Sequence, residues 1–430
     1  MRTIFPDPLP IGSRSRAQRC CSSSRALRLP FQFRYFALNT ILLCAFVIVF
    51  ACPAAQAQDA AALAPQKFTH APPTLPITDF YAAPDPLPPG QPGELIRSAP
   101  FYEYQLSYKV SAVRILYHSR SPTGQDVAAS GVVLIPDKTP PPGGWPVIAW
   151  AHEFTGSAPQ CAPSLVGNLN DGPLLSMYAG LGFAVVASDY AGLGVNFPHA
   201  AFDMRSNALD VLYAVPAARA ALPQLARKWL VAGYAQGGLV AVGVAEAAAQ
   251  TDDPNFLGAI AISGVADPAQ FFSRMLETST YSTLLFLAKG LSVVFPEFHP
   301  PDILTPNALP LYEYLNHACQ AGSGPPLPAD HMLQPAWQEN RYVKEFFARN
   351  NPGQRSSAAP LLIISGGSDP DVPSSLTAAA VAQLCRQKDR VVFISYPNLA
   401  SSALIGNSVS EQVSWIRARF AGRSAPSNCP

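Results

Sequence analysis

The sequence predicts an α/β fold built on a mostly parallel sheet. From about residue 146 onward, short apolar segments of strand length alternate with helical stretches, as in successive β–α–β units. The alternation stops between Asp267 and Gly353, where apolar helical pieces and repeated prolines occur without a strand pattern. Glycines at 233, 237 and 238 mark a sharp turn from a strand into a helix. Together these observations indicate a sheet with a helical insertion.

The composition excludes several classes of protein. Of the 430 residues, 13% are charged and 49% hydrophobic, so the chain is neither a disordered protein nor a polyelectrolyte. The formal charge of +1 is unevenly spread: the first 57 residues hold seven arginines and one aspartate, leaving 22 of the basic and 27 of the acidic residues for the remainder. A mildly acidic body argues against nucleic acid as a partner.

Residues 1–57 have the features of an export signal. An arginine-rich segment precedes the apolar run 41–51, and the small-residue site Ala55-Gln-Ala57 follows it. The run is shorter than the ~20 apolar residues that a membrane span needs. Cleaved export to a secreted or periplasmic location is the favoured interpretation. A later start site, a retained anchor and lipid attachment at Cys52 are alternatives, and an uncleaved leader is the only membrane contact we expect.

Cleavage after Ala57 leaves four cysteines, Cys161, Cys319, Cys385 and Cys429. An even number in an exported chain favours disulfides over metal binding, and the sequence has no Cys-x-x-Cys or His-Glu-x-x-His motif. We therefore expect neither a metal nor a cofactor. Of the three connectivities we favour Cys161–Cys319 and Cys385–Cys429, the second of which fastens the C-terminal tail to the last large helix. Buried free thiols are the alternative.

The elements follow in chain order. Residues 58–79 form a Pro/Ala-rich stem, and no strand periodicity is visible before residue 100. A hairpin is expected next, with strands at 110–117 and 127–136. Further strands are expected at 146–151, 184–188, 229–233, 257–263, 360–365 and 390–396, and helices at 174–181, 206–221, 238–249, 374–385 and 409–420.

This pattern divides the chain into a core and an insertion. Residues 80–266 and 354–430 form the α/β core, and residues 267–353 form a helical cap. We expect the cap to cover the carboxyl edge of the sheet, where open α/β folds place their binding sites. A cap with a purely structural role is the alternative.

The segment Trp229–Val240 is a strand, a tight turn and the start of a helix. Gly233 and Gly237 stand two positions on either side of the turn residue, the spacing of a nucleophile elbow. In a working hydrolase the turn residue carries an attacking atom, whereas here it is Ala235. Taken alone, the glycine spacing is also explained by close packing of strand and helix.

The wider context strengthens this interpretation. From about Asp79 onward the chain resembles the secretory lipase family, the lipase A-type α/β hydrolases. The segments that carry the resemblance are Pro86–Gly90, Pro92–Arg97, Trp150–His152, Cys161–Ser164, Asp189–Gly194, Pro198-His199, Gly233–Gly238, Asp369 with Val372-Pro373, Leu384-Cys385 and Trp415–Gly422. The resemblance implies an α/β-hydrolase fold and activity on lipid or other carboxylic esters.

Members of that family use serine, aspartate and histidine in that chain order. Carried over by position, the nucleophile falls on Ala235, the acid on Asp369 and the histidine on Ser401. All seven histidines precede Asp369, so the order cannot be completed anywhere in this chain. The resemblance therefore implies a triad of which the aspartate alone is retained.

The oxyanion-hole loop also departs from the family. Many relatives have His-Gly-Thr-Thr-Gly after the first parallel strand, whereas this chain has His152-Glu153-Phe154-Thr155-Gly156. Glu153 and Phe154 thus stand where donors to the oxyanion are expected, and a carboxylate there opposes the developing charge. Gln236 retains a backbone N–H for the hole.

Three hypotheses follow. Loss of the nucleophile or the base of such a triad costs about 10⁶ in kcat, which favours an exported, catalytically impaired relative that binds an apolar, acyl or ester ligand under the cap. The second is a working esterase or triacylglycerol lipase that uses other residues, with His152, His199, Ser157 and Ser263 as candidates. The third is a surface scaffold or interaction protein.

Overall fold

The computed structural model describes residues 75–429, except for 107–108, 278–281 and 321–327. The expected export signal at 1–57 and most of the stem at 58–79 lie outside the described residues. Within the described part of the chain, no helix is long and apolar enough to cross a membrane.

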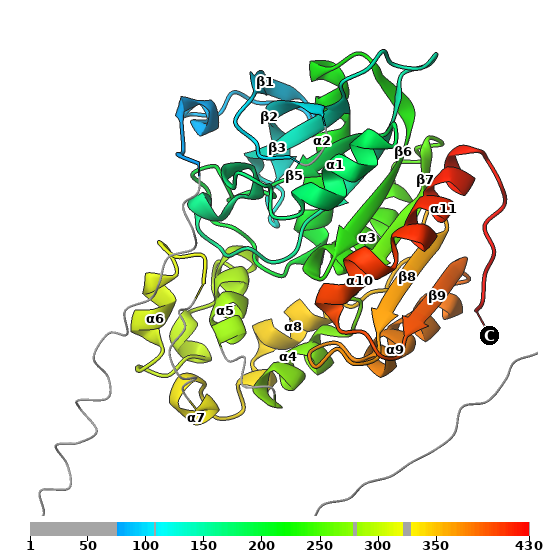
Figure 1. The fold of residues 1–430 in the computed structure, drawn as a ribbon. Helices are drawn as coiled ribbons and strands as arrows, with labels where there is room; N and C mark the ends of the chain where they lie inside the picture. The colour runs from blue at the N-terminus through cyan, green and yellow to red at the C-terminus, as the bar shows by residue number, and fades with distance from the viewer. Residues whose placement is uncertain (1–74, 107–108, 278–281, 321–327, 430) are drawn as a thin grey trace, which may run out of the picture. The chain divides into compact units, whose positions relative to one another are not determined.

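The described residues form one nine-stranded sheet (Figure 1) in the order β1-β2-β3-β5-β4-β6-β7-β8-β9. Pairing is antiparallel from β1 through β2 and β3 to β5, and parallel among β5, β4, β6, β7, β8 and β9. The predicted α/β-hydrolase fold with its mostly parallel sheet is thereby confirmed. The strands are Leu95–Phe101, Val110–Arg120, Asp126–Pro136, Trp145–Ala151, Ala184–Ser188, Leu225–Tyr234, Phe256–Ile262, Leu361–Gly366 and Val391–Tyr396, numbered β1 to β9 in chain order.

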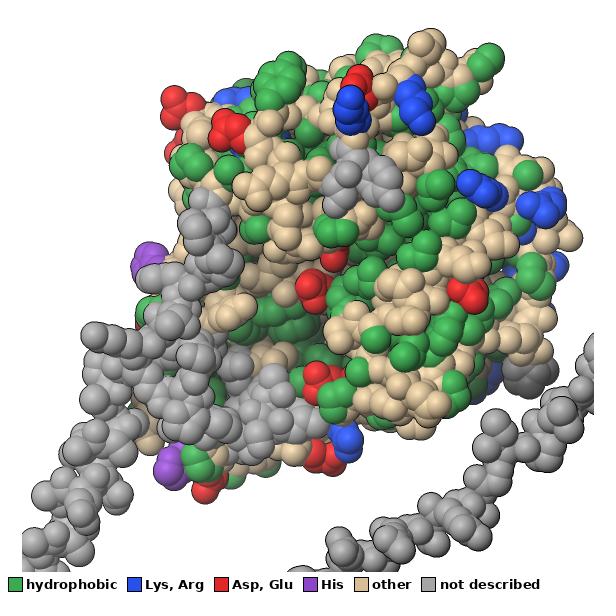
Figure 2. Space-filling model, viewed as in Figure 1, with side chains coloured by type: hydrophobic (Ala, Val, Ile, Leu, Met, Phe, Trp, Pro, Cys, Tyr) green, Lys and Arg blue, Asp and Glu red, His purple; other side chains and the backbone are tan. Residues whose placement is uncertain are grey.

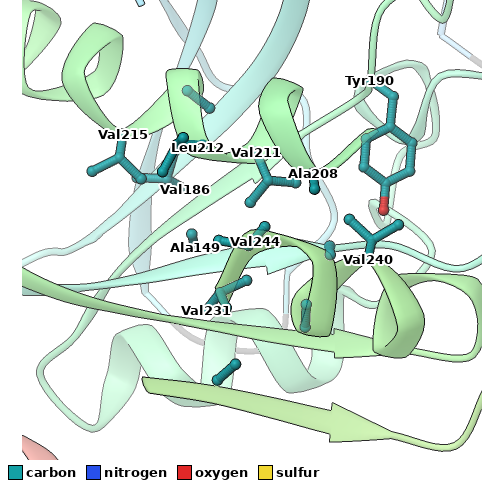
Figure 3. Packing of buried hydrophobic residues seen from close by; sticks show 14 of the residues in the cluster. Ala149, Val186, Tyr190, Ala208, Val211, Leu212, Val215, Val231, Val240 and Val244 are labelled. Atoms are coloured by element: carbon teal, nitrogen blue, oxygen red, sulfur yellow. The ribbon is translucent and has the colours of Figure 1, made fainter. Parts of the chain in front are cut away.

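Helices cover both faces of the sheet because its central strands are apolar on both sides. Along β4, Val147 and Ala149 pack with one helical layer, while Ile148 and Trp150 pack with the other. Figure 3 shows the first layer, in which valines of α2 and α3 meet Ala149 and two strand valines. This layer comprises α2 (Met204–Ala221), α3 (Gln236–Ala248) and α9 (Ser374–Arg386), and the other comprises α1 (Gly172–Gly180), α10 (Ser401–Asn407) and α11 (Val409–Phe420).

In the described residues between β7 and β8, the chain forms helices joined by loops, with an isolated bridge between Leu304 and Leu333. It has its own apolar core, which includes Phe272, Leu285 and Phe346. Its helices are α4 (Pro268–Glu277), α5 (Ser282–Val294), α6 (Leu309–Tyr314), α7 (Ala329–Met332) and α8 (Arg341–Arg349). We keep the name cap for residues 267–353.

Both favoured disulfides are present. Cys161–Cys319 has a Cα–Cα distance of 5.4 Å and joins the loop after β4 to the cap. Cys385–Cys429 has a Cα–Cα distance of 5.6 Å and fastens the C-terminal tail to α9. The alternative of buried free thiols is therefore wrong for these four residues.

Two elements of the core were not expected from the sequence, the short helix α10 and the strand β1. Strand β1 at Leu95–Phe101 falls in the stretch before residue 100 that was expected to lack a strand. It is an edge strand that pairs with β2 and keeps several side chains partly exposed. An edge strand is held to the sheet mainly by backbone hydrogen bonds to one neighbour. Its side chains therefore need not alternate between apolar and polar, and the sequence shows little strand pattern there.

Figure 2 shows how sparsely charge is distributed over the viewed face. Red and blue side chains occur at scattered points among tan and green ones, in agreement with the charged content of 13%.

Candidate active site

A cavity of about 240 Å³ lies against the cap and the carboxyl ends of the parallel strands. Its lining includes all six positions singled out in the sequence, namely Ala235, Gln236, Asp369, Ser401, Glu153 and Phe154. The cap contributes Phe271, Phe272 and Met275 from α4. We call this cavity the elbow pocket.

The turn at Ala235 has the backbone of a nucleophile elbow. Strand β6 ends at Tyr234 and α3 begins at Gln236, and Ala235 between them has φ 51° and ψ −118°. An L-residue in such a conformation carries strain of about 1–3 kcal/mol. The elbow is thus folded in full, although its central side chain is a methyl group.

Neighbouring glycines make this turn sterically feasible. A Cβ atom added to Gly233 would lie 2.0 Å from the carbonyl oxygen of Gly237, and one added to Gly237 would lie 2.0 Å from that of Ala151. At Gly264 an added Cβ would come within 1.8 Å of the Ala235 carbonyl oxygen. Strand, turn and helix therefore approach each other closely enough that no side chain fits between them.

Asp369 is buried and firmly held in the loop that follows β8. Its Oδ1 accepts backbone N–H groups of Asp371 and Val372, each at 3.0 Å. Its Oδ2 accepts the hydroxyl of Ser263 at 3.2 Å. The carboxyl group is therefore positioned by the loop and by a serine.

A chain of hydroxyl groups extends from Asp369 to Ser401. The Ser401 Oγ lies 2.9 Å from the Ser263 Oγ and 3.3 Å from the Tyr234 Oη. Burial raises the pKa of Tyr234, so its phenol stays protonated at neutral pH. Sequence reasoning did not find Tyr234 and considered Ser263 only as a substitute nucleophile. None of these hydroxyls is a base at neutral pH.

Among the residues the structure describes, no histidine lines the elbow pocket. The ring nitrogens of His152 lie 2.5 Å and 3.2 Å from the backbone oxygens of Glu153 and Asp189. His199 Nδ1 lies 2.9 Å from the Ala191 oxygen. Burial lowers the pKa of each imidazole to about 4. Both rings are thus neutral and engaged with the backbone.

Of the two serines considered as substitute nucleophiles, the structure places one in the pocket. Ser263 lines it, whereas the buried, unpartnered hydroxyl of Ser157 belongs to a different cavity. Ser263 Oγ is hydrogen-bonded to a carboxylate and a second hydroxyl, with no imidazole beside it among the described residues.

The region expected from the sequence to hold the oxyanion donors has both apolar and acidic side chains. Gln236 is the first residue of α3, so its backbone N–H has no acceptor within the helix. The Phe154 ring packs against Phe202 and the cap residue Phe286, with centroids 4.7 Å and 4.6 Å away. The Glu153 carboxyl group has no hydrogen-bond or ion-pair partner among the described residues, and burial, then Asp171, raises its pKa to about 7. An ionised Glu153 would oppose an oxyanion.

The chain has an α/β-hydrolase fold, and solved structures of lipases and esterases share it. Candida antarctica lipase A in its closed state has a TM-score of 0.72 and 17% identity, covering 83% of this chain and 89% of the lipase. The rice cell wall degrading esterase LipA of Xanthomonas oryzae has a TM-score of 0.62 and 20% identity, covering 77% and 99%. A putative hydrolase from Legionella pneumophila has a TM-score of 0.61 with the same identity and coverage.

These likenesses confirm the lipase A-type resemblance at the level of the fold. A comparison with models of protein families finds no match, and a comparison with curated proteins finds none.

Replacing Ala235 with glycine is expected to stabilise the protein. Glycine adopts φ 51°, ψ −118° without the strain that alanine carries. The strain energy that is removed exceeds the free-energy cost of ordering the more flexible glycine on folding. We expect the free energy of unfolding to rise by about 1 kcal/mol in urea titrations. The matched control Ala232→Gly, in strand β6, should be destabilised. Equal losses in the two variants would contradict a strained elbow.

The Glu153 carboxyl is expected to make stability depend on pH. Its pKa is raised from 4.5 to about 7 on folding, so the unfolded chain releases the Glu153 proton at a lower pH than the folded chain does. The contribution of Glu153 to the free energy of unfolding therefore falls as pH rises from 4.5 to 7. Glu153→Gln should therefore stabilise the protein at pH 8 more than at pH 4.5. Unfolding midpoints at the two pH values measure this, with the exposed Glu297→Gln as control. A pH response identical to that of the unmodified chain would refute the assignment.

Proposed function

We propose that this chain is an exported, catalytically impaired α/β-hydrolase-fold protein that holds an apolar acyl or ester ligand in the elbow pocket. The observation that carries the proposal is the combination of a complete elbow backbone with an alanine at its centre. The lack of a histidine among the described lining residues adds to it.

Ester hydrolysis through a triad needs an attacking oxygen and a base to remove its proton. The methyl group of Ala235 supplies no oxygen, and at the histidine position Ser401 supplies no base. Removing either function from such a triad lowers kcat by about 10⁶, and removing both lowers it little further. Binding and any remaining oxyanion-hole donor leave at most about 10³–10⁴ over water.

The shape and lining of the elbow pocket favour a ligand with an apolar body. Its lining includes four aromatic side chains, Phe154, Phe202, Phe271 and Phe272. It also includes Asp369 and the hydroxyls of Ser263 and Ser401. An acyl chain with an uncharged polar ester end matches this combination. The lipase and esterase named above support an ester-like ligand by analogy of fold.

Restoring the missing groups tests the proposal directly. We expect Ala235→Ser with Ser401→His to hydrolyse p-nitrophenyl butyrate at least about 10² times faster than the unmodified chain, since general base catalysis contributes 10²–10⁴. The unmodified chain should remain unlabelled by a fluorophosphonate probe. Because Ser263 stands between position 401 and Asp369, the double variant is also made with Ser263→Ala.

The controls separate a restored triad from other activity. Adding Asp369→Asn to the active variant should remove the gain in hydrolysis rate. Ala235→Ser alone and Ser401→His alone should each give little hydrolysis. Stoichiometric labelling and rapid turnover by the unmodified chain would overturn the proposal and favour the working hydrolase. Lipid extraction and mass spectrometry of the purified protein should recover a bound apolar ligand, and an empty pocket would favour a scaffold.

Export is the second part of the proposal. The two disulfides are compatible with an oxidising compartment, and the sequence of residues 1–57 has the pattern of a signal. We expect N-terminal sequencing of protein recovered outside the cytoplasm to begin at Gln58. Recovery of the full-length chain in the reducing cytoplasm, with four free thiols, would contradict it.

A further inference from the structure

A second cavity, of about 360 Å³, lies beside α2 and α3. Three arginines line it: Arg205 in the first turn of α2, Arg349 at the end of α8, and Arg355 in the loop that follows. We call it the arginine cavity. Met204, which is 2% exposed, lines both this cavity and the elbow pocket.

One of the three arginines is already paired. Arg349 Nε lies 3.2 Å from Oδ1 of Asp203, a fully buried carboxylate that also caps α2. The guanidinium groups of Arg205 and Arg355 form no hydrogen bond or close ion pair with any residue that the structure describes. Arg205 is partly exposed and Arg355 is exposed, and Glu246 attracts both from within the cavity without a direct contact.

The remaining acid in the cavity does not neutralise them fully. Glu246 is 6% exposed and accepts the backbone N–H of Gly353 at 2.7 Å. Burial raises the pKa of Glu246 to about 7, so much of it is protonated at neutral pH. Burial, followed by the charges of Arg355 and Arg349, lowers the pKa of Arg205, which places the three cations within electrostatic reach of one another.

We propose that the arginine cavity binds an oxyanion, a phosphate or carboxylate group, through Arg205 and Arg355. Guanidinium groups bind planar and tetrahedral oxyanions with paired N–H donors, and an anion here would relieve the repulsion among the three cations. Arg349, held by Asp203, also lines the cavity and supplies a third positive charge.

The same chemistry can come from a free anion or from the head group of an amphiphile. Met204 is the side chain shared by both cavities, and methionine changes rotamer readily. An amphiphile with its head group on the arginines would have to displace Met204 for its chain to reach the elbow pocket. The anion site itself does not depend on the function proposed for that pocket.

Calorimetric titrations at low salt test the proposal with three probes: inorganic phosphate, decyl phosphate and decanol. We expect at least one phosphate probe to bind, and Arg205→Gln with Arg355→Gln to weaken that binding at least tenfold. Glu246→Gln should strengthen it, because it removes the opposing charge. The matched control Arg227→Gln removes an exposed arginine outside the cavity and should leave binding unchanged.

The outcomes separate the two sources. Equal affinities for inorganic phosphate and decyl phosphate identify a free-anion site, whereas much tighter binding of decyl phosphate identifies an amphiphile. Absence of phosphate binding, or binding that the double variant and Arg227→Gln affect equally, overturns the proposal. Decyl phosphate that binds no better than decanol also overturns it, unless inorganic phosphate binds and the double variant weakens that binding. Circular dichroism and unfolding curves of every variant establish that each is folded.

Discussion

The close contact of backbone with backbone at the elbow is the constraint on which the rest of the site depends. Gly237 lies against the Ala151 carbonyl, and Gly264 lies against that of Ala235. These contacts fix the ends of β4, β6 and β7 relative to the start of α3. The loops that leave those strands therefore converge on the elbow pocket whichever side chain stands at position 235.

This constraint also explains how the elbow backbone can form around an alanine. The strain at Ala235 is retained because the surrounding packing imposes the turn. Asp369 is retained in place because backbone N–H groups and Ser263 satisfy its carboxylate, so no imidazole is needed to stabilise it. A buried carboxylate without hydrogen-bond partners would be costly, and these three donors avoid that cost.

The sequence predicted the parts of this molecule that local patterns encode. Buried strands such as Ala184–Ser188 were located because continuous apolar runs and glycine turns are visible along the chain. Strand β1 was missed because its pairing with β2 is a long-range contact between backbones. The elbow and Asp369 could be placed by resemblance, and the structure brings them into one cavity.

The remaining features of the site arise from the meeting of distant segments. Ser263, Ser401 and Tyr234 come from three separate stretches, and their hydrogen bonds exist only once β6, β7 and α10 are assembled. Arg205 and Arg355 are 150 positions apart and carry no motif. In a chain with few charges, their shared cavity becomes visible only from the folded arrangement.

The position of Glu153 follows from how the cap is fastened. Gly156 lies so close to the Cys161–Cys319 disulfide that an added Cβ would stand 2.7 Å from the Cys161 sulfur and 2.8 Å from the Cys319 Cα. The loop that carries Glu153 and Phe154 is therefore confined between β4, the disulfide and the cap. Confinement keeps the partly buried carboxyl beside the pocket, and burial is the main cause of its raised pKa. The disulfide that joins this loop to the cap thus also helps to hold an acidic side chain at the elbow pocket.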